Sequence, residues 1–136
     1  MSKAFNLDSR LEKDTLFVCR LDLAQIQLSL DANYPWCLLI PEVNGRQEFS
    51  DLSQADFLKL QKESLDLQLA MQKLFQPDKL NVAMLGNVVS QLHIHHIARY
   101  KNDIAWPGPI WNTTEKRKYS KADLTKRIEQ LSAILS

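Results

Sequence analysis

The chain has 136 residues and a mass of 15.7 kDa, which suits one domain with a sizeable core. Its 17 basic and 16 acidic side chains leave a net charge of +1, which excludes a global attraction to nucleic acid or an anionic membrane. No stretch reaches the roughly 20 apolar residues of a membrane span, and residues 1–5 lack the apolar core of a signal peptide. Cys19 and Cys37 lie in apolar runs, as is typical of buried free thiols in a reducing compartment. We therefore expect a single cytoplasmic domain over residues 1–136.

The first half of the chain predicts a short helix and three strands. Ser9 and Glu12 have the spacing of a helix capping box. Apolar or alternating runs predict strands at about 15–20, 23–30 and 36–40. The alternation of the second run favours an antiparallel strand with one buried face and one exposed face.

The second half predicts a long helix, a hairpin and a final helix. An amphipathic helix begins near Ser53 and ends before Pro77, and we expect it to lie across one face of the sheet. A strand over 80–85 and the tight turn permitted by Gly86-Asn87 predict a hairpin with a strand over 91–97. Residues 106–111 contain two prolines, which exclude regular structure, and a capped amphipathic helix begins at about 120. These elements predict a single unit of the α/β type with about five strands, a long helix and a C-terminal helix.

The three histidines of the chain lie in the predicted strand 91–97. Successive side chains of a strand point to opposite faces, so Gln91, His93 and His95 share one face and His96 lies on the other. A neutral imidazole, with an ordinary pKa of about 6.5, is a nucleophile at cytoplasmic pH and can attack phosphorus. The attacking nitrogen must lack a proton, the other nitrogen needs an acceptor, and the phosphate needs donors. The face with two histidines is therefore a candidate catalytic site.

The stretch Gln91-Leu92-His93-Ile94-His95-His96-Ile97 resembles the signature of the histidine-triad (HIT) superfamily of nucleotide hydrolases and transferases, in which histidines alternate with apolar residues. The order of elements over about 10–100 is similar as well. The resemblance implies an α+β, HIT-like fold with an antiparallel sheet of about five strands, whose core covers these residues and to which the aromatic loop and helix of 101–136 are added. It also implies a homodimer, a pocket for a nucleoside 5′-phosphate, and chemistry that needs no cofactor.

The resemblance also implies roles for individual residues. His93 takes the place of the nucleophile that attacks the α-phosphorus, and His95 that of a donor to the phosphate or leaving group. Gln91 stands in place of the first histidine, where it can orient a neighbour through hydrogen bonds but cannot relay protons by titration. Asn87 matches a polar position near the phosphate, and Asp31 matches an acidic position that binds ribose hydroxyls.

Some of these residues also fit structural roles. Asp31 and Asn87 both suit turns. Trp106 and Trp111 are both candidates to cover the nucleobase, since aromatic rings stack on bases, or to pack the C-terminal segment; packing is favoured for Trp111, and Trp106 is the candidate for the base.

Two of the histidines have alternative interpretations as well. His96 replaces an apolar residue of the signature and fits a core or interface position. Zinc would suit His93 and His95, but a zinc site needs three or four protein ligands and no Cys or Asp lies close by in sequence. We therefore predict no metal site.

The sequence thus predicts an enzyme that hydrolyses or transfers a nucleoside monophosphate group through a nucleotidyl-histidine. Its substrate would be a nucleotide phosphoramidate, a dinucleoside polyphosphate or a similar NMP-X compound. The alternative is a nucleotide-binding sensor in which the Gln91 replacement has cost activity. A metal-binding interaction protein is the third class.

Overall fold

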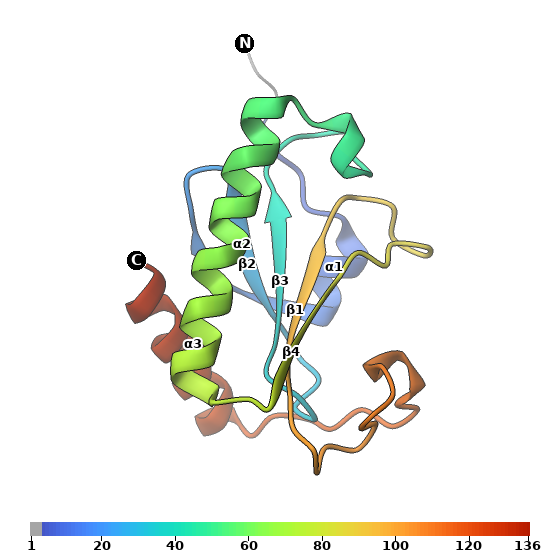
Figure 1. The fold of residues 1–136 in the computed structure, drawn as a ribbon, viewed down its shortest axis with the longest axis vertical. Helices are drawn as coiled ribbons and strands as arrows, with labels where there is room; N and C mark the ends of the chain where they lie inside the picture. Colours follow the sequence, from blue (N-terminus) through green and yellow to red (C-terminus); the bar gives the residue numbers. More distant parts are fainter. Residues whose placement is uncertain (1–3) are drawn as a thin grey trace.

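A computed structural model describes residues 4–136 and contains a five-stranded sheet (Figure 1). The helices are α1 (Ser9–Asp14), α2 (Gln54–Phe75) and α3 (Lys121–Leu135), and the strands are β1 (Thr15–Arg20), β2 (Ala24–Ser29), β3 (Trp36–Pro41), β4 (Lys79–Ala83) and β5 (Ile94–Arg99). Short 3₁₀ helices cover Phe49–Asp51 and Ile110–Asn112. The strand order is β1-β2-β3-β5-β4 with antiparallel neighbours, which confirms the predicted fold class. Residues 1–3, on which the expectation about a signal peptide partly rests, lie outside this description.

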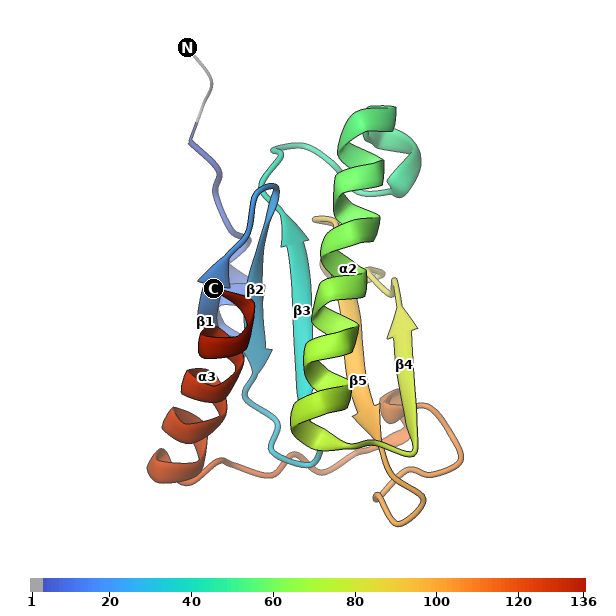
Figure 2. The ribbon, with the colours of Figure 1, turned by 60° about the vertical axis from the view of Figure 1, so that its left-hand side comes forward.

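The two faces of the sheet are covered by different parts of the chain. Helices α2 and α3 lie side by side across one face, and α1 lies behind the sheet (Figure 2). Strand pairing aligns Ile26 with Leu39 and Leu39 with Ile94, and all three side chains join the core under the long helices. The opposite face carries two smaller apolar clusters, one around Leu11 of α1 and one around Ile110 of the C-terminal loop. The candidate histidines His93 and His95 therefore belong to the less covered face.

Helix α2 forms where the sequence predicts it. The Ser53 hydroxyl accepts a hydrogen bond from the Asp56 backbone N–H and caps the first turn. Leu60 and Leu67, seven residues apart, are both buried against the sheet. The helix ends at Gln76, which has a left-handed backbone (φ 45°) and precedes a proline that cannot continue the helix.

Helix α1 begins differently from the prediction. The cap is Asp8 rather than Ser9, because the Asp8 carboxylate accepts the Arg10 N–H at 2.9 Å and Ser9 is already the first helical residue. The predicted capping box is therefore wrong by one residue, although the helix itself is present.

Strand β2 also differs from the prediction, because all six of its residues are buried. Its polar side chains form a chain of hydrogen bonds in which Thr15 binds Gln27, Gln27 donates to Gln25, and Gln25 Nε2 donates to Glu42 Oε2 at 3.1 Å. Alternation in the sequence correctly assigns the β2 side chains to the two faces of the sheet. It does not show that the face carrying Gln25 and Gln27 is also covered by other parts of the chain.

The connection between β4 and β5 is a loop over residues 84–93, and not the predicted tight turn. Strand β5 begins at Ile94 because the residues before it bind elsewhere: the Leu92 N–H donates to the Arg46 carbonyl at 2.9 Å, and the Gln91 side chain binds the N-terminal segment. His93 is therefore the last residue of a loop, placed at the entrance of the strand.

Candidate active site

The surroundings of His93 fix the tautomer of its neutral ring. Its Nδ1–H donates to the Gln91 carbonyl oxygen at 2.6 Å, and a carbonyl can only accept, so in the neutral ring the proton lies on Nδ1. Nε2 keeps its lone pair, and among residues 4–136 it has no hydrogen-bond partner. The side chain is buried yet lines a cavity, which is the geometry that a nucleophile requires.

His95 is held in the opposite tautomer. The indole Nε1–H of Trp36 donates to Nδ1 of His95 at 3.0 Å, and because an indole nitrogen only donates, Nδ1 must be the acceptor. The proton therefore lies on Nε2, which donates to the Leu85 carbonyl at 3.3 Å. The rings of His93 and His95 meet edge to face with centroids 4.8 Å apart. A bare nitrogen and an N–H donor thus stand side by side.

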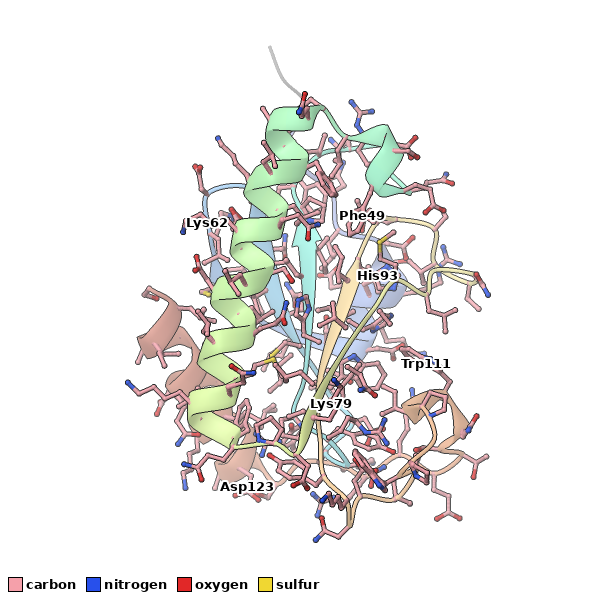
Figure 3. The ribbon with its side chains drawn as sticks, viewed as in Figure 1. Phe49, Lys62, Lys79, His93, Trp111 and Asp123 are labelled. Atoms are coloured by element: carbon pink, nitrogen blue, oxygen red, sulfur yellow. The ribbon has the colours of Figure 1, made fainter. Side chains whose placement is uncertain are left out.

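Two tryptophan rings surround His95. Trp36 lies at the start of β3, with its ring centroid 5.6 Å from that of His95, and Trp111 of the C-terminal loop lies at 4.9 Å. Figure 3 shows His93 and Trp111 on the same side of the ribbon, away from Lys62 on α2. The C-terminal loop therefore contributes to the site.

A cavity of about 870 Å³ opens beside both histidines, a volume typical of small-molecule sites. Its lining combines apolar side chains with a few polar groups from distant parts of the chain. The polar and charged members are Asp14, Thr15, Ser29, Asp31, Asn87, His93, His95, Lys116, Arg117, Lys118 and Tyr119. The apolar members are Leu11, Leu30, Trp36, Leu38, Leu85, Val88, Val89, Trp111 and Leu124. The structure therefore brings four of the candidate residues, His93, His95, Asp31 and Asn87, to one cavity.

Asp31 is buried and rigidly held in the wall of this cavity. Its Oδ1 accepts hydrogen bonds from the backbone N–H groups of Asn33 at 3.0 Å and Arg117 at 3.2 Å. Among residues 4–136 no hydrogen bond uses Oδ2, so this oxygen is available to a hydroxyl of a ligand. Oδ1 of Asp31 thus stabilises the turn, while Oδ2 is the oxygen that could bind a ligand.

Gln91 lies differently from the expectation that it would share the face of His93 and His95. Its Oε1 accepts the Asp8 N–H at 2.8 Å, and its Nε2 donates to the Asn6 carbonyl at 2.8 Å. The side chain therefore fastens the N-terminal segment, and it borders a separate cavity of about 110 Å³. Only the backbone carbonyl of Gln91 contacts His93, so the orienting contact comes from the main chain.

Trp106 lies outside the lining of the large cavity. It packs instead near the buried Arg99 guanidinium, which lies 5.8 Å from its ring centroid. That guanidinium holds Asp103 through two hydrogen bonds of 2.7 and 2.9 Å and also donates to the Gly108 carbonyl. The ion pair fixes the loop so that Trp111, and not Trp106, reaches the histidines.

His96 lies on the opposite face, as strand alternation predicts. It is fully buried under α2, where Nδ1–H donates to the Ile94 carbonyl at 3.0 Å and Nε2 accepts from the Ser64 hydroxyl at 2.7 Å. Gln68 in turn donates to the same hydroxyl. Both ring nitrogens are satisfied within the protein, so His96 is a core residue.

Burial keeps two of the histidines neutral. Burial and the neighbouring His93 lower the pKa of His95 to about 4. Burial likewise lowers the pKa of His96 to about 4.

Within residues 4–136 no group of three or more His, Cys, Asp or Glu side chains is arranged to hold a metal ion, and no helix is long and apolar enough to span a membrane.

Fold and site together define a class of protein in which one histidine at the entrance of a central strand and a second histidine within that strand line the same cavity. Residues 10–102 match the model of the HIT domain family, and the chain belongs to that family. It is similar to a solved histidine triad protein from Bradyrhizobium japonicum, with 36% identity, a TM-score of 0.96, and 98% of this chain and 100% of that chain covered. A histidine triad protein from Marinobacter aquaeolei VT8 has 38% identity and a TM-score of 0.93, with 98% and 97% covered.

More distant structures share the fold alone. One is a hypothetical histidine triad nucleotide-binding protein from Sulfolobus tokodaii, with 17% identity, a TM-score of 0.67, and 93% of this chain and 87% of that chain covered. No curated protein matches the chain.

Sequence reasoning did not assign two parts of the site. Trp36 was not singled out, because its hydrogen bond to His95 depends on the pairing of β3 with β5. For Trp111 the sequence favours packing of the C-terminal segment over contact with a ligand, because nothing in the sequence shows that Arg99 folds the loop back.

Proposed function

We propose that the protein hydrolyses or transfers the nucleoside monophosphate group of NMP-X compounds, such as nucleotide phosphoramidates or dinucleoside polyphosphates. The observation that carries the proposal is the pair of opposite tautomers, with a bare Nε2 on His93 next to an N–H donor on His95. His93 attacks the α-phosphorus, His95 donates to the phosphate, and water resolves the nucleotidyl-histidine.

The cavity supports a nucleotide as the substrate. It is large enough for a nucleoside, most of the surface that lines it is apolar, and Asp31 offers Oδ2 to ribose hydroxyls. Asn87 borders both the large cavity and the small one beside His93, where a phosphate would lie. Trp111, which lies beside His95, covers the base or the leaving group, whereas Trp106 lies outside the lining of the cavity.

The proposal is tested by trapping the intermediate. Wild-type protein mixed with an AMP phosphoramidate or a dinucleoside polyphosphate is expected to release AMP and to carry an adenylyl group on His93 by mass spectrometry. His93→Ala should do neither, while Lys62→Ala, on the outer side of α2 (Figure 3), should match wild type. Absence of AMP release by wild-type protein that still binds AMP would contradict the proposal.

A nucleotide sensor is the second candidate. The observation that favours it is the position of Gln91, whose side chain binds the N-terminal segment and supplies nothing to the cavity. The same experiment decides between the two, because a sensor binds AMP but forms no adenylyl-histidine.

We also propose that the protein is a homodimer that works in the reducing cytoplasm. Among residues 4–136, β4 pairs only with β5, so its outer edge has free backbone groups, and exposed Val82 lies beside an apolar groove that reaches Trp111. Both cysteines are buried as free thiols, which agrees with a reducing compartment.

A further inference from the structure

We infer that Trp36 is a positioning residue that fixes His95 as a neutral Nε2–H donor, and that the site therefore acts on nucleotides whose leaving group departs as an anion. Phosphoric, sulfuric and carboxylic mixed anhydrides of a nucleoside monophosphate belong to this class, whereas phosphoramidates of alkyl amines do not. The second part of the inference rests on the proposed function and narrows its substrate.

The contact between Trp36 and His95 fixes one nitrogen of the imidazole. The indole N–H has no acceptor capacity, so the 3.0 Å hydrogen bond exists only while Nδ1 of His95 is unprotonated. Protonation of His95 would place two N–H groups against each other. Trp111 packs on His95 edge to face and forms no hydrogen bond to it, so of the two tryptophans only Trp36 selects the tautomer.

The second nitrogen of His95 is the one that a substrate can reach. Its Nε2–H donates to the Leu85 carbonyl over 3.3 Å, a long contact, and both residues line the cavity. A phosphate oxygen can replace this carbonyl without disturbing the Trp36 contact. His95 then acts as a fixed donor that stabilises charge on the phosphate.

The charged surroundings of His95 reinforce the neutral state. His93 lies beside it on the cavity side and His96 on the helix side, and neither carries a compensating negative charge. The titratable groups that line the rest of the cavity are Asp14, Asp31, Lys116, Arg117, Lys118 and Tyr119. With its pKa lowered to about 4 by burial, only about a thousandth of His95 is protonated at pH 7.

Neither histidine of the site consequently supplies a proton to the leaving group. His93 keeps its proton on Nδ1 in the bond to the Gln91 carbonyl, and the Gln91 amide does not titrate. The cations of the cavity wall belong to residues 116–118, a segment that pairs with Asp31 and Ala32 and not with β5. An alkyl amine, which must be protonated to leave, therefore receives no proton from either histidine.

The chemical step balances without an acid. The Nε2 lone pair of His93 forms a bond to the α-phosphorus, the bond from phosphorus to the leaving group breaks, and the electron pair leaves with that group as its anion. His93 becomes an adenylyl-imidazolium that still holds its Nδ1 proton. Water then attacks the phosphorus, restores the neutral imidazole and releases AMP and a proton.

The first test measures the tautomers directly. Long-range ¹H–¹⁵N spectra of the wild-type protein should show His95 protonated on Nε2, with no titration above pH 5. Trp36→Phe keeps a ring but removes the donor, so the Nδ1–H tautomer should appear and the pKa should rise by at least one unit, with kcat falling about tenfold and KM changing less. Trp111→Phe, on the other side of the same imidazole, should leave the tautomer unchanged. An Nδ1–H tautomer of His95 in the wild type would overturn the inference even if Trp36→Phe failed to fold.

The second test compares leaving groups on one nucleotide. Adenosine 5′-phosphosulfate and diadenosine triphosphate should exceed an AMP N-alkylphosphoramidate in kcat/KM by about a hundred-fold or more, the usual contribution of a general acid. Equal rates would overturn the leaving-group inference while leaving the proposed function intact. Release of AMP from none of the three would overturn both, whereas the tautomer of His95 would still decide the role of Trp36.

Discussion

His95 and His96 are neighbours in sequence and are buried to a similar degree, yet they meet opposite environments. Both ring nitrogens of His96 form hydrogen bonds within the protein, one to the Ile94 carbonyl and one to the Ser64 hydroxyl, and the side chain is buried beneath α2. On the cavity face, His95 has one exchangeable contact to Leu85, and His93 has one nitrogen with no partner. The chemistry of a histidine on this strand is therefore decided by which of its nitrogens the protein leaves available.

The largest effect expected from this difference is on activity. His93→Ala should lower kcat by at least about a thousand-fold, because it removes the nucleophile, while changing the free energy of unfolding by less than about 1 kcal/mol. Turnover assays and urea denaturation measure the two quantities. Loss of stability without loss of turnover would assign His93 to structure.

The reverse is expected on the helix face. His96→Ala should lower the free energy of unfolding by about 3 kcal/mol, because it leaves a cavity and an unpaired Ser64 hydroxyl under α2. The folded fraction should retain turnover. Ser64→Ala, which removes the same hydrogen bond without the large cavity, should cost about 1 kcal/mol, and an equal cost for both variants would contradict the packing argument.

His95 and His96 should make the free energy of unfolding depend on pH. Their pKa values are depressed to about 4, so between pH 6.5 and 4 the unfolded state binds more protons than the folded state. The contribution of the two histidines to the free energy of unfolding is therefore fully present above pH 6.5. As the pH decreases, the free energy of unfolding falls by at most about 1.4 kcal/mol per pH unit for each histidine. Urea midpoints at pH 7, 6, 5 and 4.5 measure the slope. A His96→Leu variant should lose about half of it, and an unchanged slope would exclude His96 as a source.

The two edges of the sheet offer a comparison of the same kind. Val82 on β4 and Leu16 on β1 are both 44% exposed, but only Val82 adjoins the groove that leads to Trp111. Val82→Lys should convert the proposed dimer to a monomer in analytical ultracentrifugation, and Leu16→Lys should not. A shift caused by Leu16→Lys alone would place the interface on the other edge.

The smallest effect is expected at Gln91. Gln91→Ala should cost about 1 kcal/mol of stability by releasing Asn6 and Asp8, and it should change kcat by less than about tenfold because the backbone carbonyl still orients His93. Gln91→His is the matched variant. A large gain in kcat with histidine would show that the side chain at this position limits catalysis.

Strand alternation placed His93 and His95 on one face and His96 on the other, and the apolar stripes located α2 and α3. Local patterns succeeded because faces and helix periods are set by residues close in sequence. They failed for the loop over 84–93, for the burial of Gln25 and for the side chain of Gln91. Each of these depends on hydrogen bonds to partners that are distant in the chain, which no single-sequence pattern encodes.

The anchoring of the N-terminal segment by Gln91 has a practical consequence for handling the protein. The side chain of Gln91 binds residues 6–8, and its backbone carbonyl holds His93. We therefore expect an affinity tag before Met1 to disturb the position of the nucleophile. The C-terminus follows α3, which lies on the helix face, behind the sheet from that site (Figure 2). Tags and fluorophores therefore belong at the C-terminus.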